Sequence, residues 1–254
     1  MVYYIKSQLN NALKRKYTRY YFFGIVAMCL LANSAMSAFR SILYGMNDGT
    51  YASNLIIFAK GFFWVPYYSC IFIADIVFGD TYPDPRIRDK STIGLTRIHI
   101  YFGKLITELI MLVVYALIAV LVFLIITPIF QVHDGTIDIS VMLDFVQSVV
   151  IAFPLLIVGV SAANMFLFSA KTKKQAYILF GACVIVLPRI IMLLATDSFR
   201  IIPLVWVRDW LITPQFQTLQ FYATRDVPKI IITSIIYTIV TCVIGCRSFK
   251  KREF

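Results

Sequence analysis

The chain alternates between long apolar runs and short polar segments, and this pattern predicts six transmembrane helices. A membrane-spanning helix needs roughly 20 mostly apolar residues. Six stretches meet this requirement: residues 20–39, 55–78, 100–130, 142–168, 176–195 and 229–246. Together they leave no room for a separate soluble domain of catalytic size. We therefore expect an all-α polytopic membrane protein with a six-helix transmembrane domain over residues 20–246.

The segment before the first run, residues 1–19, has the pattern of an amphipathic helix. Apolar residues recur there at helical spacing and lie opposite polar ones: Val2, Ile5, Leu9, Ala12 and Leu13 against Lys6, Asn10 and Lys14. Such a helix lies in the membrane interface with its apolar face toward the lipid. The alternative interpretation is a short basic tail.

The last connection, residues 196–226, is long and apolar and contains two prolines, Pro203 and Pro214. We expect it to form an outer re-entrant segment in which Trp206 and Trp210 anchor at the headgroup level. Its function is either to cover a translocation path or to pad the lipid-facing surface. Residues 247–254 are expected to form a basic cytoplasmic tail.

Composition supports the membrane class, and charge gives the orientation. Hydrophobic residues make up 60% of the chain, and the mean hydropathy is +0.80. If there are six spans, 17 of the 24 Lys and Arg residues fall on the side that holds both termini. Because positive flanking residues stay inside, both termini are expected to be cytoplasmic in a multi-pass membrane protein.

The net charge of +11 does not indicate nucleic-acid binding, because the basic residues are spread over four membrane-flanking segments. Membrane lipids and acidic partner surfaces are the expected counter-charges. The five cysteines lie inside predicted spans, and His99 and His133 are isolated, so no catalytic residue, metal site or cofactor is expected in this chain. The sequence contains no phosphate-binding loop either, so we expect no enzymatic activity.

Three ionisable residues, Asp75, Lys104 and Glu108, fall near the inner ends of the second and third spans. Charges inside spans are costly and are therefore candidates for function. We expect them to form an intramembrane polar cluster that fixes the geometry of the neighbouring cytoplasmic segment. The alternative is that they reach individually to the interface. In neither case do they form a midplane series of acids for ion coupling.

One segment after the second span, TIGLTRIHIYFGKLI, gives a family resemblance. It resembles the permease subunits of type-2 ABC exporters (type V exporter-like), in which a segment Gly-x-x-Arg-x-x-Ile-Tyr-x-x-Lys enters the third span. The matching residues, with a one-residue difference in spacing, are Gly94, Arg97, Ile100, Tyr101 and Lys104. The tail GCRSFKKREF is similar to endings in that family. One departure is GDTYPDPRIRDKST, where family members often have Glu followed by Gly-Thr.

The resemblance implies that residues 79–99 contain a coupling helix that docks on a dimer of separate ATPase subunits. The candidate contacts are Arg86, Arg88, Asp89, Lys90 and Arg97. Pro83 and Pro85 stiffen the entry to this segment. ATP and Mg would be bound by the ATPase, and a second permease subunit, identical or paralogous, would complete the pair. The alternative is a solvated polar loop that only satisfies the positive-inside rule.

The expected function is that of a permease subunit in an ATP-driven bacterial exporter. By analogy with the family, the substrate is an amphiphilic peptide, an antimicrobial or a lipid-like molecule, and a role in immunity follows from the same analogy. A secondary transporter or channel remains open, as does a membrane assembly factor that transports nothing.

Overall fold

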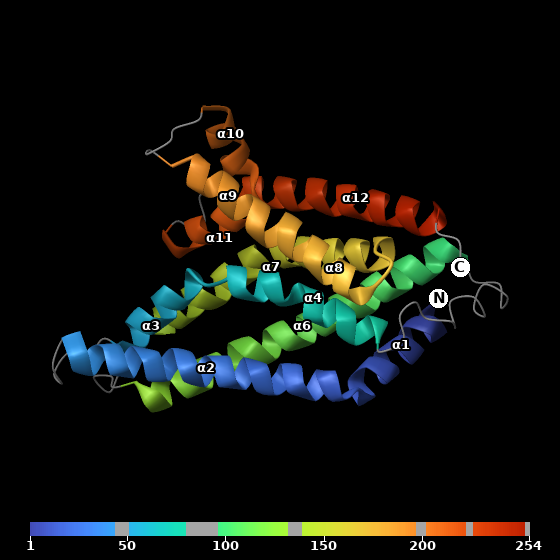
Figure 1. Cartoon of the computed structure of the whole chain (residues 1–254). Coiled ribbons are helices and arrows are strands. Elements are labelled where there is room, and N and C mark those ends of the chain that lie inside the picture. The colour runs from blue at the N-terminus through green and yellow to red at the C-terminus, as the bar shows by residue number, and fades with distance from the viewer. Residues whose placement is uncertain (44–50, 80–95, 132–138, 197–201, 222–225, 252–254) are drawn as a thin grey trace.

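The structure, a computed structural model, describes residues 1–43, 51–79, 96–131, 139–196, 202–221 and 226–251. Within these ranges, all regular secondary structure is helical (Figure 1). Among the described residues, five helices are long and apolar enough to cross a membrane, and a bent pair makes six if it is one span. The predicted all-helical class is confirmed, and the architecture is compatible with a multi-pass membrane protein.

The helices follow one another in a simple order. The first part comprises α1 (Val2–Lys14), α2 (Lys16–Leu43), α3 (Tyr51–Lys60) and α4 (Trp64–Phe78). Next come the long helices α6 (Arg97–Phe130) and α7 (Ile139–Ser169). A continuous helical stretch then contains α8 (Lys173–Phe180), the π-helix η1 (Gly181–Val186) and α9 (Leu187–Leu194). The last part comprises α10 (Ile202–Trp210), α11 (Ile212–Phe221) and α12 (Val227–Lys251).

The second predicted span, residues 55–78, is not one straight helix. It is divided into α3 and α4, whose axes differ by 63°. Gly61 lies at the break, and Pro66 near the start of α4 has no N–H with which to continue the backbone ladder. Total hydrophobicity, from which the span was predicted, is insensitive to such a break.

The structure corrects one predicted boundary and adds an irregularity inside another predicted span. α12 continues to Lys251, so most of the expected basic tail is the last turn of this helix. The fifth span contains the π-helix η1 directly before Pro188. Prolines and π-helical turns both interrupt the usual hydrogen-bond ladder, and π-helical turns often occur at functional sites.

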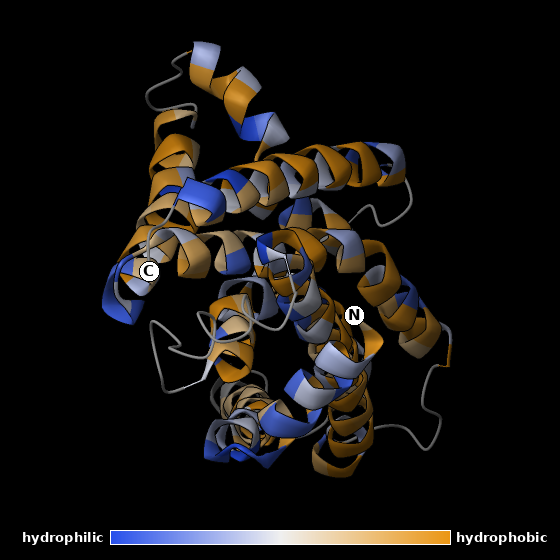
Figure 2. Cartoon of the chain, turned by 90° about the vertical axis from the view of Figure 1, so that its right-hand side faces the viewer, coloured by the Kyte–Doolittle hydropathy of each residue, from blue (hydrophilic) through white to orange (hydrophobic). Residues whose placement is uncertain are grey.

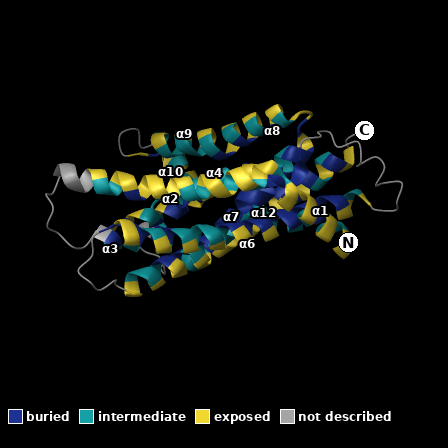
Figure 3. Ribbon diagram, turned by 90° about the horizontal axis from the view of Figure 1, so that it is seen from below, coloured by how far each residue is buried: buried dark blue, intermediate teal, exposed yellow. Residues whose placement is uncertain are grey.

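α7 is the central helix of the bundle and packs along α12 and α4, while α6 packs against α2. α1 lies against α6 and α4. Figure 3 shows that α2 is largely exposed, and Figure 2 shows that hydrophobic residues predominate in the helices. Many large hydrophobic side chains are exposed. Apolar surfaces of this extent are not stable in water, so they are compatible with contact to lipid.

Both chain termini lie at one end of the bundle (Figure 1). At this end α4 reaches Phe78, α6 begins at Arg97 and α12 reaches Lys251. We call it the terminal end. Residues 80–95, which belong to the predicted coupling segment 79–99, connect α4 to α6, so this segment is attached at the terminal end.

Candidate functional site

The end of α4 is held by an arginine from the junction of α1 and α2. Arg15 donates a hydrogen bond to the carbonyl oxygen of Ile76. A helix leaves its last carbonyl groups without partners and has partial negative charge there, so a cation is favourable. Gly79 follows with a φ of +82°, and a Cβ at this position would collide with the Arg15 guanidinium group.

A second contact ties α4 to α8 at the same end. Lys173 Nζ lies 2.7 Å from Asp75 Oδ1, and both side chains are largely buried. We expected Asp75 to pair with Lys104 and Glu108, and the structure gives Asp75 a different partner. The reason is that α8 starts beside the last turn of α4, which places Lys173 within reach of the carboxylate.

The start of α6 is tied to the end of α12. Arg97 Nη1 donates to the carbonyl oxygens of Lys250, at 2.7 Å, and of Phe249, at 3.4 Å. Thr96 caps α6 by accepting a hydrogen bond from the backbone N–H of His99. Arg97, which we expected to face an ATPase, therefore satisfies the terminal carbonyl groups of another helix.

These contacts form a helix-end junction, which we define as Arg15, Asp75, Gly79, Arg97 and Lys173. It anchors both helices that flank residues 80–95. The other predicted coupling residues, Arg86, Arg88, Asp89 and Lys90, lie outside the described residues, so their role stays a prediction.

Lys104 and Glu108 both point into the bundle. Lys104 is 1% exposed and Glu108 is 0% exposed. Lys104 Nζ lies 3.9 Å from the centroid of the Phe78 ring, at a distance typical of a cation–π interaction. Because both side chains are buried, the alternative that they reach individually to the interface is wrong.

Helix α6 contacts α12 closely beside this pair. Tyr101 is buried, and a Cβ at Gly245 would collide with its ring. Further along the same packing, the hydroxyl groups of Ser161 and Thr241 lie 2.9 Å apart and join α7 to α12. No local pattern distinguished Ser161 from other small polar residues in the spans, because its partner Thr241 is 80 residues away.

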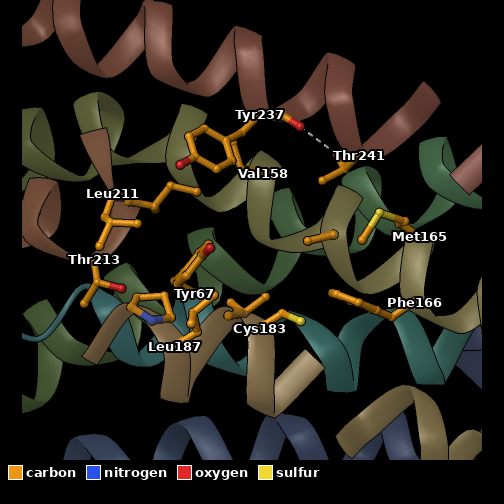
Figure 4. A pocket seen from close by; sticks show the side chains of 14 residues that line it. Tyr67, Val158, Met165, Phe166, Cys183, Leu187, Leu211, Thr213, Tyr237 and Thr241 are labelled. Carbon is orange, nitrogen blue, oxygen red and sulfur yellow. Dashed lines mark hydrogen bonds between the residues drawn. The ribbon is translucent and has the colours of Figure 1, made fainter. Parts of the chain in front are cut away.

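A cavity of about 230 Å³ lies between α4, α7, the η1–α9 stretch, α11 and α12. Its walls are mostly apolar, and Tyr67, Tyr237, Thr213 and Thr241 add hydroxyl groups. Figure 4 shows the side chain of Tyr67 reaching into the cavity from one side and Tyr237 closing it from the other. The π-helix contributes Cys183 and Val184 to the wall. The cavity can hold an apolar group that carries one or two polar atoms.

A second, more open groove of about 410 Å³ lies between α2, α4 and α6 on the outside of the bundle. Its walls are apolar and include Gly24. Tyr21 lies beside it, with its hydroxyl 2.7 Å from the Ser69 hydroxyl and its ring 4.6 Å from the Tyr115 ring.

Trp206 and Trp210 lie on α10, which contacts α9 and α11 (Figure 1). Their side chains are 73% and 48% exposed. Lys229 Nζ lies 5.9 Å from the centroid of one Trp210 ring. An exposed aromatic pair with a neighbouring cation is suited to the headgroup region, and the anchoring role stays a prediction.

Two polar contacts at the other end of the bundle were not anticipated. Lys60 is 6% exposed, and its Nζ lies 2.5 Å from Asp144 Oδ2. The Gln131 amide donates to the backbone carbonyl of Asn33, at 3.0 Å, and joins α6 to α2. Each pair is separated by more than 80 residues in the sequence, so only the packing of the helices could reveal it.

No protein-family model matches this sequence, and no curated protein is significantly similar to it. The fold, with at least five helices among the described residues that are long and apolar enough to cross a membrane, supports the class of helical, multi-pass membrane proteins. Any narrower function has to be inferred from the residues and geometry of this chain.

Proposed function

We propose that this chain is the membrane-spanning permease subunit of an ATP-driven exporter, as its resemblance to type-2 ABC exporter subunits implies. In this proposal residues 80–95 and the flanking helix ends face the cytoplasm and dock on a separate ATPase dimer, which binds ATP and Mg. A second permease subunit, identical or paralogous, completes the transporter. The membrane is the bacterial plasma membrane.

The observation that carries the proposal is the helix-end junction. A movable segment transmits force only if the helices on either side of it are coupled to the rest of the bundle. α4 is coupled through Arg15 and through the Asp75–Lys173 ion pair, and α6 is coupled through Arg97. A displacement of residues 80–95 would therefore reach α8, α12 and the α1–α2 junction together.

The cavity of Figure 4 supports an amphiphilic substrate. Its walls come from α4 and α12, which both end at the junction, and from the η1–α9 stretch. Mostly apolar walls with tyrosine and threonine hydroxyl groups suit a hydrocarbon chain, or an apolar peptide side chain with a polar atom beside it. Antimicrobial peptides and lipid-like molecules share this chemistry.

Two other functions compete with this proposal. A secondary transporter or channel would work without ATP, and a membrane assembly factor would move no substrate. The buried Glu108 favours the secondary transporter, because intramembrane carboxyl groups mark ion pathways in such proteins.

The decisive experiment is purification of the full-length protein in detergent from its own host, followed by a search for a stoichiometric ATPase chain. We expect that chain to copurify and its ATP hydrolysis to change when the permease is reconstituted with it. Reversal of charge at the predicted contacts, Arg86→Glu, Arg88→Glu and Lys90→Glu together, should lower copurification at least tenfold.

A matched control reverses three exposed charges at the same end of the bundle but outside the segment: Lys174→Glu, Arg247→Glu and Lys251→Glu. This variant has the same change in net charge and should retain the ATPase. The proposal is refuted if no ATPase copurifies, or if the two triple variants lose it equally.

A further inference from the structure

Three buried polar side chains lie on two helices that pack together, Tyr101 and Glu108 on α6 and Asn164 on α7. Both carboxylate oxygens of Glu108, both amide atoms of Asn164 and the hydroxyl of Tyr101 lack hydrogen-bond partners among the described residues. All three side chains are 0% exposed. Buried polar atoms in folded proteins nearly always have partners, so such a group indicates a bound water or ion. We call these residues the Glu108 cluster.

The backbone geometry brings the cluster together. Tyr101 and Glu108 are two helical turns apart and therefore share one face of α6. The side chains of Tyr101 and Asn164 are close neighbours, although their polar atoms do not meet hydrogen-bond geometry. The Tyr101 ring centroid is 5.0 Å from that of Phe168, one turn after Asn164 on α7. On the other side, Gly245 of α12 gives the Tyr101 ring its space.

The charged and titratable side chains that face Glu108 come from three helices. They are Lys104 and Tyr101 on α6, Cys70 on α4 and Cys242 on α12. α7 contributes only neutral polar groups, Asn164 and Ser161, and the Ser161 hydroxyl is already bonded to Thr241. Lys104 carries the only positive charge in this set.

Lys104 does not satisfy the carboxylate directly. Its ammonium group lies over the Phe78 ring, and neither oxygen of Glu108 accepts a hydrogen bond from the described residues. A carboxylate that is buried without a bonded counter-charge is strongly unfavourable. Lys104 attracts it only from a distance, so the cluster can accept a further positive charge at the oxygens of Glu108.

We propose that Glu108 binds one small monovalent cation inside the bundle, a proton or a sodium ion, with Asn164 and Tyr101 as its further partners. Carboxylate, amide and hydroxyl oxygens are hard ligands that suit sodium. A proton would instead turn the carboxyl group into a donor to Asn164 Oδ1. In either case the orphaned atoms gain partners. This inference does not depend on the proposed transport function.

Thermal unfolding of the full-length protein in detergent tests the proposal. Sodium chloride is exchanged for choline chloride at constant ionic strength and pH, and in a second series pH is varied at constant sodium. For a sodium ion, Tm should rise by roughly 3 °C for each tenfold increase in sodium above its dissociation constant. For a proton, Tm should fall as pH rises, because the unfolded chain releases the proton that folded Glu108 holds.

Glu108→Gln keeps the shape of the side chain and removes its charge, so it should abolish the sodium or pH dependence that the cluster causes. Asn164→Ala should weaken a sodium dependence at least tenfold in apparent affinity. In the proton case, an infrared band of a protonated carboxyl group should disappear in Glu108→Gln. The quantities compared are the dependence of Tm on sodium or pH and the presence of the infrared band. A variant that shifts Tm equally under all conditions therefore does not obscure the result.

The control variant is Asp144→Asn, which removes a carboxylate on the same bundle that is 45% exposed and already paired with Lys60. It should retain the cation dependence of the wild-type protein. If wild type and Glu108→Gln respond identically to sodium and to pH, and no carboxyl band is lost, the cluster binds no cation and the proposal is wrong.

Discussion

Gly79 occupies a place that requires glycine for two independent reasons. Its φ of +82° is rarely adopted by other residues, and its position faces the Arg15 guanidinium group at close range. The residue therefore lets α4 stop against the arginine that caps it. Nothing in the sequence distinguished Gly79 from the other glycines, because the arginine lies 64 positions earlier.

We predict that Gly79→Ala destabilises the protein by about 2 kcal/mol, because the backbone becomes strained and Arg15 is displaced from the end of α4. Denaturant unfolding in a mixed micelle measures the change. Gly24→Ala is the matched control: no heavy atom lies within 4 Å of the added Cβ, and alanine favours the helix. Equal effects of the two substitutions would contradict the capping role of Arg15.

The pair Lys60–Asp144 gives a second prediction at the residue scale. Lys60 is almost fully buried, whereas Asp144 is half exposed. Removing the acid in Asp144→Asn leaves a buried ammonium group unpaired and should cost about 2 kcal/mol. Removing both charges in Lys60→Met with Asp144→Asn should cost less, as a double-mutant cycle by thermal unfolding can measure. A double variant less stable than Asp144→Asn would show that the buried charge is not the cause.

At the scale of elements, α1 illustrates what periodicity can establish. The pattern predicted a helix and an apolar face that includes Val2 and Leu13. In the structure these two side chains are 77% and 51% exposed, whereas Ala12 of the same predicted face is buried, together with the polar Gln8. The amphipathic pattern identified the helix correctly, but it did not show which face meets protein.

We predict that Gly103→Ala loosens α1, because the added Cβ would lie 2.6 Å from the Tyr4 ring. Overpacking of this kind costs roughly 1–3 kcal/mol. Hydrogen–deuterium exchange in α1 should therefore increase about tenfold, while α7 keeps its protection. Gly181→Ala, where the added Cβ meets nothing within 4 Å, should leave exchange in α1 unchanged. Unaltered exchange in Gly103→Ala would mean that Tyr4 does not hold the helix.

The long helices were predictable because a run of apolar residues is sufficient to define them. α2, α6, α7 and α12 contain the runs that the sequence indicated, with ends that extend by a few residues. Breaks of the helix inside these apolar runs were harder to predict from the sequence. The bend between α3 and α4 and the π-helix η1 depend on how neighbouring helices accommodate Gly61, Pro66 and Pro188.

At the scale of the whole molecule, both termini and both attachments of residues 80–95 lie at one end. We predict that single cysteines placed near the termini and within residues 80–95 react only with membrane-permeant thiol reagents in intact cells. Cysteines on α10 should react with impermeant reagents, because this helix is expected on the outer side. A label pattern with α10 and the termini on the same side would contradict the six-span topology.

Some residues of the candidate site could be identified from the local sequence, whereas others depend on partners that are distant in the sequence. Lys104 and Glu108 could be identified from sequence because a charge in an apolar run stands out, and the structure shows that both are buried. The partner of Asp75 could not be identified, because Lys173 belongs to a helix almost 100 positions later. Asn164 was equally hidden, since a neutral amide inside a span is conspicuous only when its atoms lack partners.

The sequence by itself determined the class of the protein, its helical content and the approximate limits of most long helices. These follow from the length and hydrophobicity of local runs, since each helix satisfies its own backbone hydrogen bonds. Only the tertiary structure decided which helix ends are capped by Arg15 and Arg97, and which polar side chains are buried together around Glu108. The physical reason is that such contacts join residues separated by many positions, and their energies depend on packing.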